Sequence, residues 1–175
     1  MDKKAAIWIS VVIYIALGIA VVTIVLTAGI PLIQKMKDQN TFVQTKDLLL
    51  ALDRNIRDVA LEGPGARRFL SPVEITRGNL YIFDENETIL WDMKTKARMQ
   101  EPNMVFEEGP LKSLLNETLV VGEYHLKVWL NYTDFINITP KSETTGPFSG
   151  IFNIYVKHVG FDDKNLPIVE LEITT

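Results

Sequence analysis

A long apolar stretch near the start of the chain is the strongest pattern in the sequence. Between Lys4 and Lys35 lie thirty residues without a charge, "AAIWISVVIYIALGIAVVTIVLTAGIPLIQ". As an α-helix this stretch would rise about 45 Å, whereas the hydrocarbon core of a bilayer is about 30 Å thick and about 20 residues cross it. The pattern therefore predicts an apolar helix over residues 6–33 that is longer than a membrane span requires.

The pattern changes in residues 34–62, where apolar side chains recur mostly at spacings of three and four with charged residues between them. This periodicity predicts an amphipathic helix that continues the apolar one. Pro31 lies at the junction, where it removes a hydrogen bond and is expected to kink or locally melt the helix. Gly63-Pro64-Gly65 is expected to end it. The apolar positions of this predicted helix are Met36, Val43, Leu48, Leu49, Leu52, Ile56, Val59 and Ala60.

From Ala66 onward, apolar and polar residues alternate with a period of two, in stretches rich in aromatic and β-branched residues. Residues 80–83 and 88–91, separated by four polar residues, predict a hairpin. Six or seven strands of this kind predict an antiparallel β-sheet or a small β-sandwich with one face packed on the amphipathic helix, and hence an α+β fold class. The segment from Thr139 to Ser149 is expected to be an exposed loop. The predicted strands lie in the stretches "RRFL", "VEIT", "NLYIF", "ETILW", "YHLKVWLNYTDFI", "GIFNIYVKHV" and "PIVELEIT".

These patterns divide the chain into a leader (1–5), an apolar helix (6–33), an amphipathic helix (34–62) and a β-rich domain (66–175). An ordinary signal peptide fits poorly, because its apolar part is only about 7–15 residues long and Leu26-Thr27-Ala28 is a poor cleavage site. A plain single-pass anchor remains an alternative for the apolar helix. Lys3 and Lys4 favour a cytoplasmic N-terminus, although Lys35 and Lys37 weaken the asymmetry of charge.

Charge and composition narrow the possible partners. The 175-residue chain has no cysteine, which excludes disulfides and thiolate metal sites, and its formal net charge is −4. Residues 34–62 carry five cationic and five acidic side chains, whereas residues 63–175 carry eleven and sixteen, a net charge of −5. Nucleic acid is not an expected partner, because affinity for it comes mostly from clustered Lys and Arg side chains.

The acceptor motif for N-glycosylation, Asn-x-Ser/Thr, occurs four times, at Asn86, Asn116, Asn131 and Asn137. With ten asparagines in the chain, chance would supply about one such motif. The four motifs therefore favour a glycosylated domain outside the cell. The competing interpretation is that Asn and Thr share a preference for turns and strand ends.

Near the start of the chain, Lys3-Lys4-Ala5 is followed by "AIWI", and this stretch resembles a class III signal sequence of archaeal type IV pilin-like proteins. In that family a prepilin-type peptidase cuts after a small residue that follows basic ones, and Lys3-Lys4-Ala5 followed by "AIWI" would place the cut between Ala5 and Ala6. The stretches "KAAIWISVVIYIALGIAVV", "LDRNIRDVALEGPGARR" and "ITRGNLYIF" look like an uncharacterised group of such proteins in small-genome archaea. The order of apolar helix, amphipathic helix and glycosylated β-domain is also similar to that of archaeal pilins and archaellins.

The resemblance implies a structural subunit that is held in the membrane before assembly and then polymerises with copies of itself into a helical filament at the cell surface. Its apolar helices would fill the filament core, and such helices need not match the thickness of a membrane. Small residues such as Gly18 would allow close approach of helices, although ordinary membrane helices have the same composition. Ser10, Gly18 and Pro31 are the residues expected to matter for assembly.

One position departs from the resembled family. Many pilins carry Glu at the fifth position after the cut, where its carboxylate can compensate the new N-terminal ammonium of a neighbour, and here that position is Ser10. A hydroxyl cannot neutralise a buried charge, whose desolvation costs several kcal/mol. This departure leaves room for a minor or uncleaved subunit.

The sequence offers little for catalysis. The two histidines, His125 and His158, lie in strand patterns without metal-ligand spacing, and no GxSxG, Walker or HExxH motif is present. Asp84-Glu85-Asn86-Glu87 has oxygen ligands suited to Ca²⁺ but is better explained as a polar hairpin turn. We therefore assign no catalytic, cofactor or metal residues. A membrane-anchored surface glycoprotein, acting as an adhesin or receptor, is the main alternative function, and a membrane-tethered enzyme is a remote third.

Overall fold

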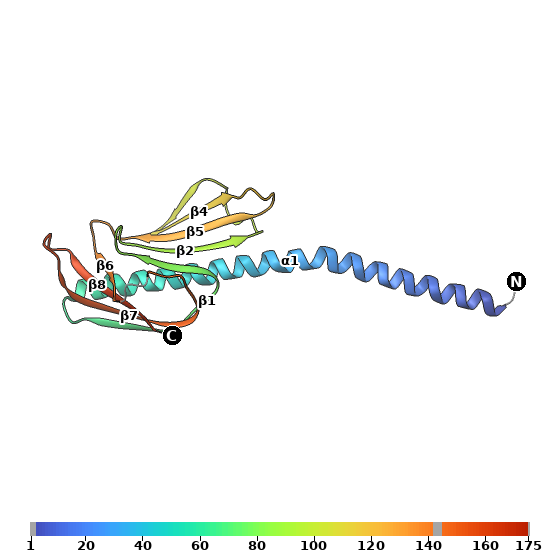
Figure 1. The fold of residues 1–175 in the computed structure, drawn as a ribbon, viewed down its shortest axis with the longest axis horizontal. Helices are drawn as coiled ribbons and strands as arrows, with labels where there is room; N and C mark the ends of the chain where they lie inside the picture. Colours follow the sequence, from blue (N-terminus) through green and yellow to red (C-terminus); the bar gives the residue numbers. More distant parts are fainter. Residues whose placement is uncertain (1–2, 142–144, 175) are drawn as a thin grey trace. The chain divides into compact units, whose positions relative to one another are not determined.

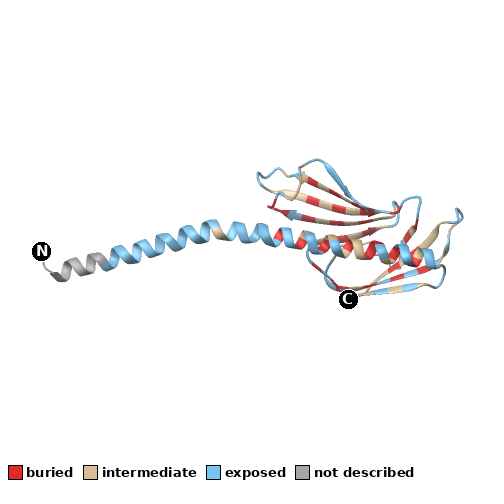
Figure 2. Cartoon of the chain, turned by 180° about the vertical axis from the view of Figure 1, so that it is seen from behind, coloured by how far each residue is buried: buried red, intermediate tan, exposed pale blue. Residues whose placement is uncertain are grey.

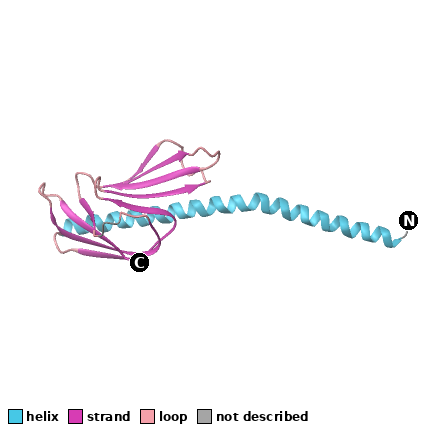
Figure 3. Ribbon diagram, viewed as in Figure 1, coloured by secondary structure: helices cyan, strands magenta, loops and turns pink. Residues whose placement is uncertain are grey.

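The computed structural model describes residues 3–141 and 145–174, and within these ranges the side chains from residue 11 onward. Contacts divide the chain into two compact units, Met1–Lys37 and Asp38–Thr175. Helix α1 (Lys3–Glu62) contributes to both units, and every strand belongs to the second. Figures 1 and 3 show this helix and the strands of the β-domain. The strands are β1 (Arg67–Phe83), β2 (Thr88–Thr95), β3 (Val105–Glu108), β4 (Leu111–Glu117), β5 (Tyr124–Asn131), β6 (Asn137–Pro140), β7 (Phe148–Phe161) and β8 (Pro167–Thr174).

The described residues of the first unit, 3–37, are all α-helical. Residues 11–37 are exposed in the single chain apart from the half-buried Gly29, and the ribbon of the exposed residues is pale blue in Figure 2. Pro31 lies inside the helix, and the residues around it remain α-helical. The local melting expected at Pro31 is therefore absent, although a proline at this position still leaves the carbonyl of Thr27 without its usual amide partner.

The second unit is one mixed sheet of eight strands, in the order β3-β4-β5-β2-β1-β7-β8-β6. All neighbouring strands are antiparallel except β6 and β8, which pair in parallel. The α+β class is thus confirmed, but the sheet is neither purely antiparallel nor a sandwich of two sheets. The predicted hairpin is confirmed as well, because Leu80 pairs with Trp91 and Phe83 with Thr88 around the turn at residues 84–87.

The second half of α1 packs on one face of this sheet. Its side chains Leu49, Leu52, Ile56 and Val59 are fully buried in one core with sheet residues that include Trp91. The alternation predicted along β5 is found here, because Leu126, Val128 and Leu130 are all buried. The packing of the amphipathic helix on the sheet is therefore confirmed.

The buried stripe of the helix does not begin as predicted. Met36 and Val43 are exposed, whereas the polar residues Asp38, Thr41 and Thr45 are buried. These three residues continue the spacing of three and four from Leu49 towards the start of the domain, so they lie on the same face of the helix. The stripe that contacts the sheet is thus apolar at one end and polar at the other.

Several strand predictions were incomplete. The stretches at residues 67–70, 73–76 and 79–83 form one long strand, β1, whose register shifts after Leu70 and after Ile75. Such shifts mark bulges, which bend a strand and re-aim its side chains. The loop predicted from Thr139 to Ser149 is too long, because β6 extends to Pro140 and β7 begins at Phe148. Strands β3, β4 and β6 were not predicted.

Gly78 permits the second bulge. Its φ of 81° lies in the left-handed region, and a Cβ at this position would meet the carbonyl oxygen of Asp92 at 2.2 Å. The adjacent carbonyl of Arg77 accepts a hydrogen bond of 3.0 Å from Nε1 of the buried Trp91. Only glycine has room for this backbone, so the bulge fixes the central tryptophan of the core.

Candidate functional site

The apolar part of α1 is the most distinctive surface of the described chain. Its most apolar window of 18 residues has a mean hydropathy of 2.7 and is wholly exposed. By length and composition, this helix is able to cross a membrane. Its side chains require either lipid or other apolar side chains around them, because so large an exposed apolar surface is rare on soluble monomers.

The few polar groups of this segment are satisfied within the helix. The hydroxyl of Thr23 donates to the carbonyl oxygen of Ile19 at 2.8 Å, and that of Thr27 donates to the carbonyl oxygen of Thr23 at 2.7 Å. A polar side chain that bonds its own helix brings little cost in an apolar environment. The segment can therefore be surrounded by apolar groups on every side.

The predicted assembly and processing residues lie on or before this segment. Gly18 is exposed, and a Cβ added to it would meet no atom within 4 Å. Among the described residues, no tertiary contact therefore requires a glycine at this position. Ala5, Ala6 and Ser10 have helical backbone, but their side chains lie outside the described residues.

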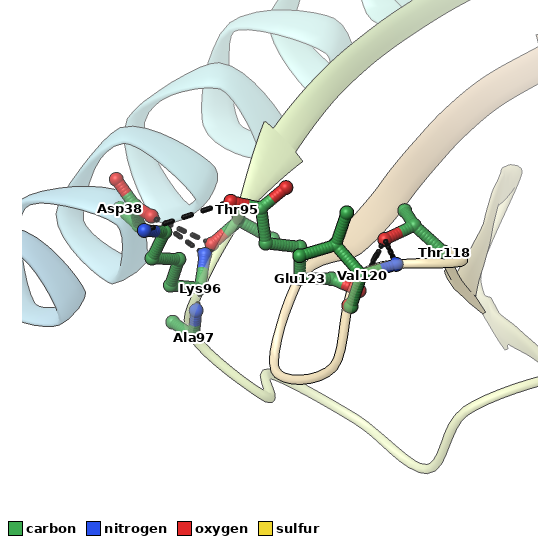
Figure 4. Close-up of polar contacts among 7 residues, drawn as sticks. All are labelled: Asp38, Thr95, Lys96, Ala97, Thr118, Val120 and Glu123. Carbon is green, nitrogen blue, oxygen red and sulfur yellow. Dashed lines mark hydrogen bonds and ion pairs between the residues drawn. The ribbon is translucent and has the colours of Figure 1, made fainter.

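A polar cluster around Asp38 joins the start of the domain helix to the sheet (Figure 4). The Oδ2 atom of the buried Asp38 accepts hydrogen bonds from Thr95 Oγ1 at 2.7 Å and from the Lys96 amide at 3.3 Å. Thr95 Oγ1 in turn accepts the Ala97 amide at 2.9 Å. Arg77 of β1 forms an ion pair with the same carboxylate. One buried carboxylate thus connects α1 with the end of β2 and with β1.

A second cluster joins the C-terminal part of α1 to Tyr132, which directly follows β5. Asp53 accepts two hydrogen bonds of 2.9 Å from Arg57 Nε and one of 3.0 Å from the hydroxyl of Tyr132. The guanidinium of Arg57 also lies over the ring of Tyr132, 5.8 Å from its centroid. Burial, followed by the negative charge of Asp53, raises the pKa of Tyr132 well above its ordinary value. The phenol therefore stays protonated and continues to donate to Asp53.

The four glycosylation motifs lie at two places in the domain. Asn86 and Asn131 are exposed and neighbour one another, because the Thr133 hydroxyl donates to the Asn86 carbonyl oxygen at 3.1 Å. Asn137 follows at the start of β6 and is half-buried. Asn116, also half-buried, lies in β4 opposite His125 of β5. All four motifs have at least partly exposed asparagines.

The two histidines have different surroundings. His125 is partly exposed, and its Nε2 lies 3.0 Å from Asp92 Oδ2 on the neighbouring strand β2. His158 is fully buried in β7, its ring 5.0 Å from that of Phe161, and neither ring nitrogen has a hydrogen-bond partner within the described part of the chain. Burial lowers the pKa of His158. Among the described residues, no group of three or more acidic or histidine side chains could hold a metal ion.

Sequence patterns gave no signal for the two clusters that join helix and sheet, because their partners are far apart in the chain. Asp38 and Thr95 are 57 residues apart, and Asp53 and Tyr132 are 79 apart. Buried carboxylates are also rare enough that the spacing alone would not single them out. Comparison with models of protein families, with curated proteins and with solved structures finds no match for this chain.

Proposed function

We propose that this chain is a structural subunit of an extracellular filament of the type IV pilus superfamily, and that it polymerises through its N-terminal apolar helix. The observation that carries the proposal is the exposure of the apolar helix on all of its faces between residues 11 and 33. Such a helix needs apolar neighbours all round. Lipid supplies them before assembly, and copies of the same helix supply them in a filament core.

The length of the apolar run favours assembly over simple anchoring. Thirty uncharged residues exceed the roughly 20 that cross a bilayer. A single anchor would accommodate the excess only by tilting or by thickening the membrane locally. A bundle of helices sets no such limit, because each helix is covered along its length by its neighbours.

The titratable side chains of the described domain favour a structural role for this chain. Its candidate chemistry consists of one buried histidine, one partly exposed histidine and two carboxylate clusters that are occupied by structural partners. The two carboxylates and His125 bond to neighbouring elements of the fold, and His158 is packed in the interior. We therefore propose no enzymatic activity and no cofactor, and nucleic acid is not a proposed partner.

The resemblance of the leader supplies the order of events. In this proposal the precursor is inserted in the membrane with its N-terminus in the cytoplasm, a prepilin-type peptidase cuts between Ala5 and Ala6, and the mature chain joins the filament. Replacing Ala5 by Trp is expected to block the cut, because the resembled peptidases require a small residue before the cleaved bond. Normal processing of that variant would contradict the assignment.

A membrane-anchored surface glycoprotein is the second candidate, and the exposed Asn86 and Asn131 favour it. An adhesin or receptor would use the apolar helix only as an anchor. Both candidates place the β-domain outside the cell, so glycan analysis does not separate them. Assembly does separate them.

The test combines N-terminal mass determination with electron microscopy of the full chain, purified from the membranes of an archaeal host. A mature chain that begins at Ala6 and forms filaments supports the proposal. An intact Met1 and separate particles would overturn it in favour of the anchor. Val21→Asp places a charge in the middle of the apolar run at a cost of about 3 kcal/mol and should abolish filaments. Val21→Leu is the matched control and should leave them intact.

A further inference from the structure

The turn between β4 and β5 projects an apolar tip, which we define as Leu119, Val120 and Val121. Leu119 and Val121 are fully exposed, and Val120 is more than half exposed. The turn is closed by its own hydrogen bonds, because Thr118 Oγ1 donates to the Glu123 carbonyl at 3.0 Å and the Glu123 amide donates to the Val120 carbonyl at 3.0 Å. A preorganised loop loses little conformational freedom on binding, which favours a contact role for the tip.

The other end of the same domain carries an apolar hollow of about 500 Å³. The hollow lies beside the C-terminal end of α1. Its most exposed apolar side chains are Leu61, at 86%, and Phe135, at 68%. Ile136, Phe161 and Pro167 are among its other lining residues, and Arg57 lines it as well. The hollow is thus an open apolar surface with one cationic group beside it.

The turn between β4 and β5, which carries the tip, and the C-terminal end of α1, which lines the hollow, lie at opposite ends of the domain (Figure 1). The tip is held near Asp38, because Lys96 binds Asp38 through its amide and pairs with Glu123 through Nζ at 3.5 Å (Figure 4). Leu61 is 23 residues further along the helix, which corresponds to a rise of about 35 Å. One copy therefore cannot fill its own hollow with its own tip.

We propose that the apolar tip of one copy inserts into the hollow of a second copy, so that the β-domains join head to tail. The contact uses two different surfaces, and each copy keeps a free tip at one end and a free hollow at the other. Such heterologous contacts continue into open helical chains unless they close into a ring. This inference rests on the proposed function, and it adds the surface through which the β-domains of neighbouring filament subunits meet.

The charged side chains beside the apolar tip and beside the hollow are opposite in sign. Glu117, two residues before the tip, is exposed and places a carboxylate beside it. Arg57 binds Asp53 through Nε, and its two terminal nitrogens make no hydrogen bond among the residues the structure describes. The carboxylate of one copy and the guanidinium of the next thus fit a charged rim around an apolar centre, the usual anatomy of an interface.

The contact surface is small, so it is expected to act together with the helices. Three apolar side chains cover less surface than a stable independent interface needs. Copies that are already held side by side by their apolar helices meet at a high effective concentration, which makes a weak second contact sufficient. The contact of the tip with the hollow would then set the spacing of β-domains along the filament.

Cysteine cross-linking of the full chain in host membranes, followed by detection of this chain alone, tests the contact without interference from native thiols of the chain, because its sequence has no cysteine. Val121→Cys and Leu61→Cys change fully or largely exposed side chains, so neither alters the core. With a short bis-maleimide, the double variant should give a ladder of oligomers. A mixture of the two single variants should give dimers only. Ile151→Cys, exposed on β7, replaces Leu61→Cys in the control pair and should give no ladder.

The outcomes separate this inference from the proposed function. Filaments with no cross-link between positions 61 and 121 would overturn the head-to-tail contact and leave the filament proposal standing. Absence of both filaments and ladder would overturn both. Dimers formed by Val121→Cys alone, with no ladder from the double variant, would show that two tips meet each other, which contradicts the contact.

The membrane surface is the competing occupant of the tip, since the chain joins Asp38 directly to the apolar segment. An environment-sensitive fluorophore attached to the thiol of the Val121→Cys variant distinguishes a tip that contacts lipid from a tip that lies in the hollow of a second copy. If the hollow covers the tip, Leu61→Glu in the same chain should shift the emission back to that of a water-exposed label. Emission that remains typical of an apolar environment in the Leu61→Glu variant would assign the tip to lipid and overturn the inference.

Discussion

The hydroxyl of Tyr132 donates a hydrogen bond of 3.0 Å to Oδ1 of Asp53, and this bond joins the residue that follows β5 to the C-terminal part of α1. Both residues are buried, and the same carboxylate also accepts two bonds from Arg57. The pair therefore keeps a buried charge satisfied while it fixes the position of helix against sheet. A buried carboxylate with fewer donors would destabilise the fold.

Tyr132→Phe is expected to destabilise the domain by roughly 1–3 kcal/mol, because it removes one donor from a buried charged acceptor and little else. Thermal unfolding of the detergent-solubilised chain measures the change. Tyr155→Phe, which alters a partly exposed tyrosine on β7, is the matched control and should change stability little. Equal stability of the two variants would contradict the role given to the Asp53 pair.

The Asp38 cluster is expected to act as a coupled unit. Asp38→Asn and Thr95→Val each remove part of the same buried contact, so their effects should not add. We expect an interaction energy of at least about 0.5 kcal/mol in a double-mutant cycle measured by thermal unfolding. Additive effects of the two substitutions would mean that the 2.7 Å bond between them contributes nothing measurable.

The stability of the domain should fall as pH is lowered through the ordinary titration range of histidine. Burial lowers the pKa of His158, so the unfolded chain takes up a proton at a higher pH than the folded one. The effect is absent above the unfolded pKa of about 6.5 and grows as pH falls below it, until the folded pKa is reached.

His158→Phe should remove this slope, because phenylalanine fills a similar volume and does not titrate. It should also stabilise the domain at neutral pH, since it removes buried ring nitrogens that have no partner in the described part of the chain. Unfolding measured between about pH 5 and 8, values chosen to bracket the range near 6.5, checks both effects. A slope that survives in His158→Phe and disappears in His125→Gln would contradict the assignment.

Gly18→Leu tests whether copies of the apolar helix pack closely at this position. Within one chain there is room for the added side chain, and leucine favours both helix and membrane, so insertion should be unchanged. If helices approach at Gly18, filament formation should be lost because the leucine separates their backbones. Val22→Leu, one turn further along the same face, adds a single methylene and is the control. Normal filaments from Gly18→Leu would exclude close packing there.

Much of the architecture follows from local patterns in the sequence. The apolar run predicts an apolar helix, Gly63 and Pro64 mark the end of α1, and the alternation of buried residues in β5 is plain. These features depend on residues close together in the chain, where period and turn chemistry give direct signals.

The features that could not be predicted depend on distant partners. Strand β3 has no buried side chain and therefore no alternation, and in β4 the buried Ser113 interrupts the apolar pattern. Ser113 is tolerated because its hydroxyl donates to Gln100 Oε1 at 2.8 Å. The buried Asp38, Thr41 and Thr45 similarly hide the start of the helix stripe from any search for apolar periodicity. Polar residues that find tertiary partners are invisible to such patterns.

The position of β8 has a consequence for how the domain is made. Residues 167–174 follow every other strand in the sequence, yet they lie between β7 and β6, and β6 hydrogen-bonds to no other strand among the described residues. During synthesis α1 is made before any strand. The sheet on which it packs forms in full only after β8 has been made. A nascent chain halted before Pro167 would carry an open edge on β7. Such an edge can recruit strands from other chains, so correct folding depends on β8 pairing with β7 before a neighbouring chain does.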